Sequence, residues 1–203
     1  QGKFDNLTAT EGANDTLIVT ATYKLGSLQK AEWHIAPDGG ARLVYSYIFN
    51  GVVDLMGVKF DLPETEVKHK EWLGCGPYRV WKNRIHGPQL GVWANDYNDP
   101  VPGESFDYPE FKGYFAGVQW MKLQTKTGMI TICPGTDKDY VGVYQPRDGR
   151  DQLLYTLPET GISMMQVIPA VRNKVNTTDL NGPSAQPVWA NGSYTGEVTL
   201  HFD

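Results

Sequence analysis

Apolar and polar residues alternate with a period of two along most of this 203-residue chain, and this pattern is typical of β-strands. Residues 16–23 show it most clearly, because every second residue there is apolar and most of the others are β-branched. The same alternation predicts strands at residues 28–35, 41–50, 52–62, 64–73, 115–124, 129–133, 139–144, 161–167 and 193–202. Strands at this spacing indicate an all-β fold, a large antiparallel sandwich or barrel. We expect little helix beyond a short turn near residues 177–180.

Turn residues separate several of these strands. Residues 37–40, with the sequence Pro-Asp-Gly-Gly, and residues 125–128, Thr-Lys-Thr-Gly, each lie between two predicted strands and predict β-hairpins. We expect the strand at residues 64–73 to end at the Gly- and Pro-rich residues 74–77. A long ordered loop is expected at residues 169–188, before the last strand.

Residues 72–120 hold eleven of the 24 aromatic residues of the chain. The segment contains too many glycines and prolines for a helix and too many aromatic rings for a linker. We interpret it as structured loops that lie over the rim of a β-core and form a recognition or docking surface.

Composition and charge narrow the possible functions. A net charge of −5 without a basic run argues against nucleic acid as a partner. The sequence has neither a run of about 20 apolar residues that could span a membrane nor a charged-then-apolar leader. The length suits one large β-domain or two small ones, and we expect a single domain covering residues 1–203. Cys75 and Cys133 allow one disulfide, although we expect two free, buried thiols.

Three short blocks carry a resemblance to a known family. They are Trp72-Leu73-Gly74-Cys75-Gly76-Pro77, Trp81-Lys82-Asn83-Arg84 and Tyr108-Pro109-Glu110-Phe111-Lys112-Gly113. They resemble the W-x-G-x-G-P, Y-x-D-R and Y-x-x-P-(Q/E)-x-x-G elements in the C-terminal small chain domain of glycoside hydrolase family 2 β-galactosidases. The second block departs from the family pattern, with Trp81 in place of Tyr and Asn83 in place of Asp.

The resemblance implies an antiparallel β-supersandwich like that of galactose mutarotase, in a domain that follows a catalytic barrel. In the family the nucleophile and the acid/base are glutamates of that barrel, so the resemblance implies no catalytic residue in this chain. Family members also have an earlier half of this domain, which implies that the chain is the C-terminal part of a larger glycoside hydrolase. The implied partners are the catalytic barrel of the same polypeptide and an oligosaccharide or galactoside. We expect a periplasmic or extracellular location.

Sugar binding is the function that best suits the aromatic segment. The apolar C–H faces of pyranoses stack on aromatic rings, while amide, guanidinium and carboxylate groups bond the hydroxyls. The candidate binding residues are Trp81, Asn83, Arg84, His86, Trp93, Asp96, Tyr97 and Glu110. The competing interpretation is that most of these rings belong to the core or face a neighbouring domain.

Other chemistries have less support in the sequence. Asp96 and Glu110 are the best candidates for glycosidase carboxylates, and His86 is the best-placed histidine for mutarotase chemistry, with a structural role as the alternative. The sequence lacks metal-ligand spacings and a Gly-rich phosphate loop, so we expect neither a metal nor a cofactor. Three hypotheses remain: an accessory domain that borders the active site of a β-galactosidase, a free-standing sugar-binding module, and a mutarotase- or lyase-like enzyme.

Overall fold

The computed structural model describes residues 2–62, 66–96, 113–143, 161–170 and 182–203. The strands are β1 (Lys3–Glu11), β2 (Leu17–Leu25), β3 (Leu28–Ile35), β4 (Ala41–Val53), β5 (Met56–Phe60), β6 (Val67–Val80), β7 (Gln89–Asp96), β8 (Tyr114–Thr125), β9 (Met129–Pro134), β10 (Tyr140–Val143), β11 (Ile162–Val167) and β12 (Val188–Phe202). Two single-turn 3-10 helices, η1 (Ala13–Asp15) and η5 (Pro183–Ala185), are the helical elements of this part of the chain. The predicted helical turn at residues 177–180 lies outside the described residues. Every strand pair is antiparallel, so the all-β antiparallel fold is confirmed.

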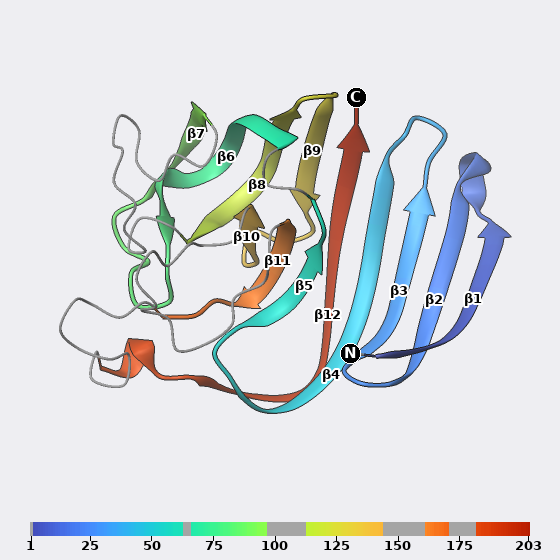
Figure 1. The fold of residues 1–203 in the computed structure, drawn as a ribbon, viewed down its shortest axis with the longest axis horizontal. Helices are drawn as coiled ribbons and strands as arrows, with labels where there is room; N and C mark the ends of the chain where they lie inside the picture. The colour runs from blue at the N-terminus through green and yellow to red at the C-terminus, as the bar shows by residue number, and fades with distance from the viewer. Residues whose placement is uncertain (1, 63–65, 97–112, 144–160, 171–181) are drawn as a thin grey trace.

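The strands form one curled sheet that folds back on itself into two layers (Figure 1). The larger layer runs in the order β1-β2-β3-β4-β12-β9-β8-β6-β7, and the smaller runs β10-β11-β5. A single pair, Val141 of β10 with Phe115 of β8, joins the two layers. This arrangement is a β-sandwich, while the likeness to galactose mutarotase stays a prediction.

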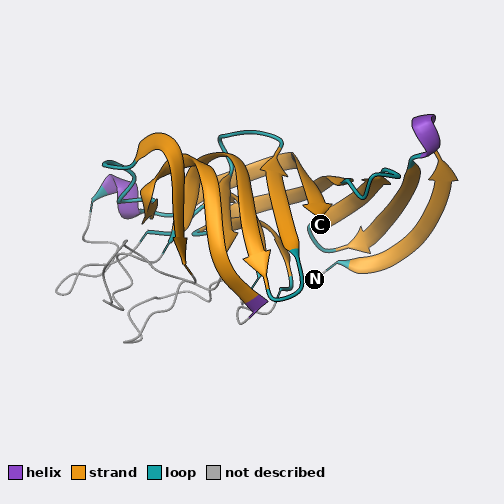
Figure 2. Cartoon of the chain, turned by 90° about the horizontal axis from the view of Figure 1, so that it is seen from above, coloured by secondary structure: helices purple, strands orange, loops and turns teal. Residues whose placement is uncertain are grey.

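The core lies between the layers, where the period-two alternation places one face of each strand. Leu43 and Tyr45 of β4 and Val198 of β12 point inward and are almost fully buried, as are Val141 of β10 and Met164 of β11 from the smaller layer. Burying these side chains supplies the hydrophobic free energy that holds the layers together. The β1–β2 hairpin contributes no buried residue and projects beyond the two-layer part (Figure 2).

Both hairpins predicted from turn residues are confirmed. β3 and β4 pair across a turn in which the amide of Ala36 donates to the carbonyl of Gly40 at 2.8 Å and Gly39 takes a positive φ of 89°. β8 and β9 pair across a turn closed by the amide of Thr125 and the carbonyl of Gly128.

Three strand predictions are corrected. β6 continues through Gly74 and Gly76 to Val80 instead of ending at residues 74–77. β1 and β7 were not predicted; β7 lies in the segment that was interpreted as loops. The glycines occur where neighbours approach β6 closely, since a Cβ on Gly74 would lie 3.1 Å from the Cα of Val118.

The interpretation of residues 72–120 as loops over the rim is also corrected. The described parts of this segment are strands of the larger layer and a turn, and Trp72, Trp81, Tyr114 and Phe115 are buried. Their rings pack edge-to-face in pairs, Trp72 with Phe115 and Trp81 with Tyr114, with centroids 4.8 and 6.1 Å apart. Most of the described rings therefore serve packing, which was the competing interpretation.

The two cysteines are free, as expected, but both are half-buried rather than fully buried. Burial raises the pKa of the Cys133 thiol, which disfavours the thiolate.

Candidate functional site

The connection between β6 and β7 carries four of the predicted site residues, Trp81, Asn83, Arg84 and His86. The last ladder pair of this hairpin is Gly76 with Gln89, and residues 81–84 form a tight turn beyond it. The amide of Arg84 donates to the carbonyl of Trp81 at 2.8 Å, and the amide of Trp81 donates back to the carbonyl of Arg84 at 3.3 Å. The backbone of the turn is therefore closed on itself, independently of the side chains that it displays.

Lys82 ties this turn to two other segments. Its amide donates to the carbonyl of Pro169 at 2.9 Å, and its ammonium group donates to the carbonyl of Gln186, next to η5. Burial lowers the pKa of Lys82, although the charge of Asp54 acts in the opposite direction. The turn is thus anchored on both sides while its outer surface stays accessible.

Four residues at this end of the hairpin, Tyr78, Asn83, Arg84 and His86, are called the hairpin end below. Arg84 and His86 are exposed, Asn83 is half-buried, and Tyr78 exposes 46% of its surface. An aromatic ring, a guanidinium and an imidazole thus leave the same end of one hairpin. These groups can stack on an apolar sugar face and donate hydrogen bonds to hydroxyls.

Trp81 does not share this surface. Its ring is fully buried in a small cluster with Val80, Tyr114, Met165 and Ile168. A buried ring offers no face on which a pyranose can stack, so we assign Trp81 to the core.

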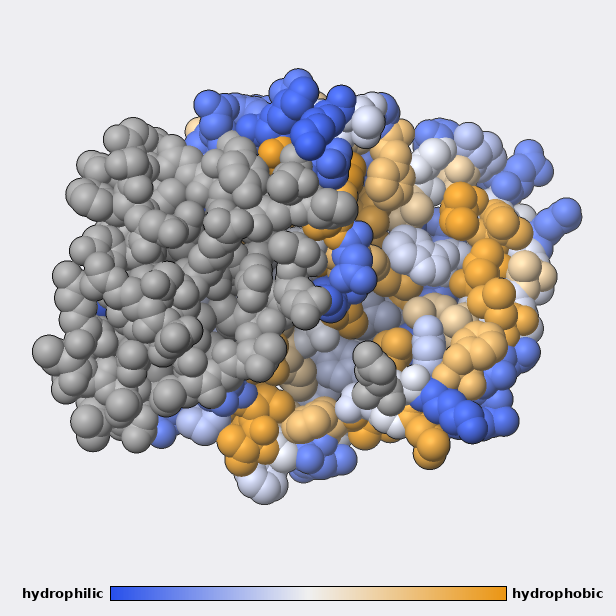
Figure 3. All heavy atoms as spheres, viewed as in Figure 1, coloured by the Kyte–Doolittle hydropathy of each residue, from blue (hydrophilic) through white to orange (hydrophobic). Residues whose placement is uncertain are grey.

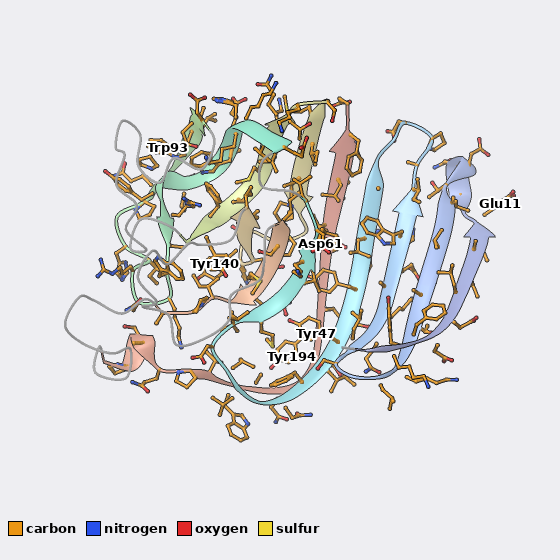
Figure 4. All side chains as sticks on the ribbon, in the orientation of Figure 1. Glu11, Tyr47, Asp61, Trp93, Tyr140 and Tyr194 are labelled. Atoms are coloured by element: carbon orange, nitrogen blue, oxygen red, sulfur yellow. The ribbon has the colours of Figure 1, made fainter. Side chains whose placement is uncertain are left out.

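Trp93 lies on β7 and is half-buried against the main core (Figure 4). Its indole Nε1–H donates to the carbonyl of Gln89 at 3.2 Å, and the ring lies directly over Gly76. The indole is therefore directed along β7 toward the hairpin end, but much of its surface is used for packing.

Asp96 lies at the opposite end of β7. Its carboxylate pairs with His69 Nδ1 at 2.9 Å, and its carbonyl accepts a bond of 2.7 Å from the buried Lys70 ammonium. From Gln89 to Asp96 a strand advances roughly 23 Å, so the structure does not bring Asp96 together with Arg84 or His86. Tyr97 and Glu110, the two remaining candidates, lie outside the described residues.

The structure reveals candidates that the sequence reasoning missed. His69 was interpreted as part of a solvated charged run, yet the β6–β7 pairing sets it beside Asp96. Tyr78 and Trp189 carry exposed rings, and Trp189 exposes 73% of its surface. Recognising β7 as a strand that pairs with β6 would have revealed the His69–Asp96 contact.

Other features of the described residues lie away from the hairpin end. A pocket of about 350 Å³ opens beside the β8–β9 turn, lined by residues such as Leu62, Met129, Ile130 and Phe202. None of the predicted sugar-binding residues lines it. In the described part of the chain, His, Cys, Asp and Glu do not gather in threes that could hold a metal ion. Nor is any helix there long and apolar enough to cross a membrane.

Comparison with known proteins places the chain in a family. No curated protein matches it. Residues 3–170, however, match the family described as beta galactosidase small chain, and these residues include β1 to β11 and the hairpin end. The match covers well over half of the 203 residues, and the observed antiparallel β-sandwich is the fold that the resemblance of the three short blocks implied. The chain therefore belongs to the β-galactosidase small chain family.

Proposed function

We propose that this chain binds carbohydrate at the hairpin end and thereby borders the active site of a β-galactosidase. Membership of the small chain family makes the chain an accessory domain of a β-galactosidase and implies association with a catalytic domain. The proposal adds a role for particular residues: Arg84, His86 and Asn83 bond sugar hydroxyls, and the exposed ring of Tyr78 lies against the apolar sugar face.

One observation carries this proposal. The turn at residues 81–84 is closed by two backbone hydrogen bonds and anchored by Lys82, yet it leaves Arg84 and His86 exposed. Binding costs less conformational entropy when the polar groups are displayed from a fixed backbone. A guanidinium supplies several donors in a fixed plane, which suits the vicinal hydroxyls of a sugar.

Titration calorimetry with galactose and galactosides tests the proposal. We expect Arg84→Ala to weaken binding at least tenfold, equivalent to about 1.4 kcal/mol. The melting temperature should hardly change, because the bonds that close the turn come from the backbone of Arg84 and not from its side chain. Tyr78→Ala should weaken binding in the same assay.

Asp96→Ala is the matched control, since Asp96 lies at the far end of β7. If this substitution removes binding while Arg84→Ala does not, the sugar lies elsewhere and the hairpin end is not the site. The chain alone could bind galactosides tightly while the substitutions that remove this binding leave hydrolysis by the assembled β-galactosidase unchanged. That result would instead favour a free-standing sugar-binding module.

A further inference from the structure

The β1–β2 hairpin carries an apolar face that nothing within the described residues covers. Phe4 exposes 56%, Leu7 58% and Leu17 43% of their surfaces. The face is completed by Ala9, Val19 and Ala21, and these six residues are called the wing face below. The carboxylate of Glu11, opposite Leu17 in the ladder, lies at the end of the same face. Figure 3 shows apolar atoms gathered on this side of the molecule, over the strands at the right of Figure 1.

The wing face is the continuation of the face that forms the core. In the ladder, Val19 of β2 lies opposite Trp33 of β3, Trp33 opposite Leu43 of β4, and Leu43 opposite Val198 of β12. Opposite residues in a ladder lie on the same face of the sheet. Leu43 and Val198 are buried and Trp33 is half-buried, whereas Leu7 and Leu17 are exposed. One continuous apolar face is thus covered at β4 and β12 and open at β1 and β2.

The other side of these strands is polar. Thr20 donates to Glu32, and Lys30 and His34 pair with the same carboxylate at 2.6 and 2.9 Å. Lys30 and His34 hold the pKa of Glu32 at about 2, so this carboxylate stays ionised in water. An amphipathic sheet of this kind buries its apolar face, so the wing face has the pattern of a buried surface.

The smaller layer ends where the wing face begins. β5 is its last strand, and among the described residues it pairs only with β11. The rings of Phe60 in β5 and Trp33 in β3 pack edge-to-face with centroids 6.0 Å apart. This contact marks where the smaller layer stops covering the larger one. In the described part of the chain, the edge of β5 and the wing face therefore meet in a step, with backbone groups that no described strand pairs on one side and apolar side chains on the other.

We propose that a β-hairpin from the catalytic part of the β-galactosidase fills this step, adds to the edge of β5 and packs on the wing face. Adjacent strands lie roughly 4.8 Å apart, so the two uncovered strands, β1 and β2, match the width of a two-stranded addition. Ala9 and Ala21 leave space above the sheet, which suits large apolar side chains at alternate positions of the added strands. A second copy of this chain would bring the same small residues to both sides of the contact.

This proposal rests on the family's association with a catalytic domain and not on sugar binding, so the two are tested separately. Hydrogen exchange compares the chain alone with the β-galactosidase assembly that contains it. We expect amides of β1, β2 and β5 to exchange at least tenfold more slowly in the assembly. Leu7→Lys should abolish this protection, because it places a charge on the buried face.

Thr8→Lys is the matched control on the polar side of the same strand, and it should leave the protection intact. In the isolated chain both variants should have the melting temperature of the wild type, since Leu7 is already exposed there.

Two results would overturn the proposal. One is that the amides of β1, β2 and β5 exchange at the same rate in the chain alone and in the assembly. The other is that the isolated chain forms a dimer which Leu7→Lys converts to a monomer, because the wing face would then be covered by a second copy. Galactoside titration of Leu7→Lys reports on the hairpin end and should be unchanged.

Discussion

Three core tyrosines, Tyr45, Tyr47 and Tyr114, are buried in the sandwich, where a phenolate is costly. Among the described residues the hydroxyls of Tyr45 and Tyr114 have no hydrogen-bond partner, whereas Tyr47 donates to Oε1 of Gln166. Burial raises the pKa of all three, and that of Tyr47 to about 12, with the charge of Asp139 as a further cause for Tyr45 and Tyr47.

These pKa shifts predict alkaline unfolding. In the unfolded chain a tyrosine loses its proton near its ordinary pKa of 10.0, whereas folded Tyr47 keeps it up to about pH 12. The folded state therefore binds more protons in this window, and its stability falls as the pH rises through it. Tyr47→Phe should make the fall shallower, measured as melting temperature against pH. Phenolate absorbance that titrates completely near the ordinary pKa in the folded protein would contradict the burial of these rings.

Asp139 is a second buried ionisable group, 5% exposed, immediately before β10. Burial raises its pKa above the ordinary 3.8, so the folded state favours the protonated carboxyl and is destabilised when the carboxyl ionises. We expect Asp139→Asn to stabilise the protein at neutral pH by on the order of 1 kcal/mol. The gain should disappear as the pH falls to 3.8, where the wild-type carboxyl also becomes neutral. An equal gain at both pH values would show that the charge is not its cause.

At the scale of elements, the β6–β7 hairpin depends on a glycine that faces a tryptophan. A Cβ on Gly76 would lie 2.6 Å from Cδ1 of Trp93, so the indole would have to move and lose its bond to Gln89. We expect Gly76→Ala to cost about 1–3 kcal/mol of stability, measured by denaturant unfolding, and to change the fluorescence of Trp93.

Gly91→Ala is the matched control, because its Cβ would approach Trp93 less closely, with a nearest distance of 3.1 Å. It should have the smaller effect on both readouts. If the two substitutions destabilise the hairpin equally, the position of Trp93 over Gly76 is not what sets the cost.

The strands that sequence patterns predicted are those in which apolar and polar residues alternate clearly with a period of two, such as β2, β3 and β4. β1 and β7 escaped prediction because both are edge strands: β1 is exposed along its whole length, and exposed Leu90 and Val92 alternate with Gly91 in β7. The end of β6 was misplaced because its glycines were interpreted as strand breakers, whereas they make room for cross-strand neighbours.

The candidate site was predicted only in part, because β7 was not recognised as a strand. Arg84 and His86 were identified from residue type, and they are exposed as a binding site requires. Asp96 was grouped with them by closeness in sequence, but an unrecognised strand separates it from them. Burial of Trp81 depends on contacts with β8 and β11, which no local pattern reports.

At the scale of the whole molecule, the two layers cover the sheet unevenly. β12 lies between β4 and β9 and faces β5, β10 and β11 across the core. β1 pairs only with β2 among the described residues and has no buried side chain. Stability should therefore decrease along the larger layer from β12 toward β1, because local opening is easiest where few apolar contacts are lost.

Hydrogen exchange of the isolated chain tests this gradient. Amides of β9 and β12 should exchange only through global unfolding. Those of β1 and β2 should exchange faster, by on the order of a hundredfold. Added urea should separate the two classes further, because local opening exposes little surface and global unfolding exposes much. Uniform protection across β1, β2 and β12 would mean that the wing face is already covered in the isolated chain. Protection that disappears on dilution would identify a second copy of the chain as that cover.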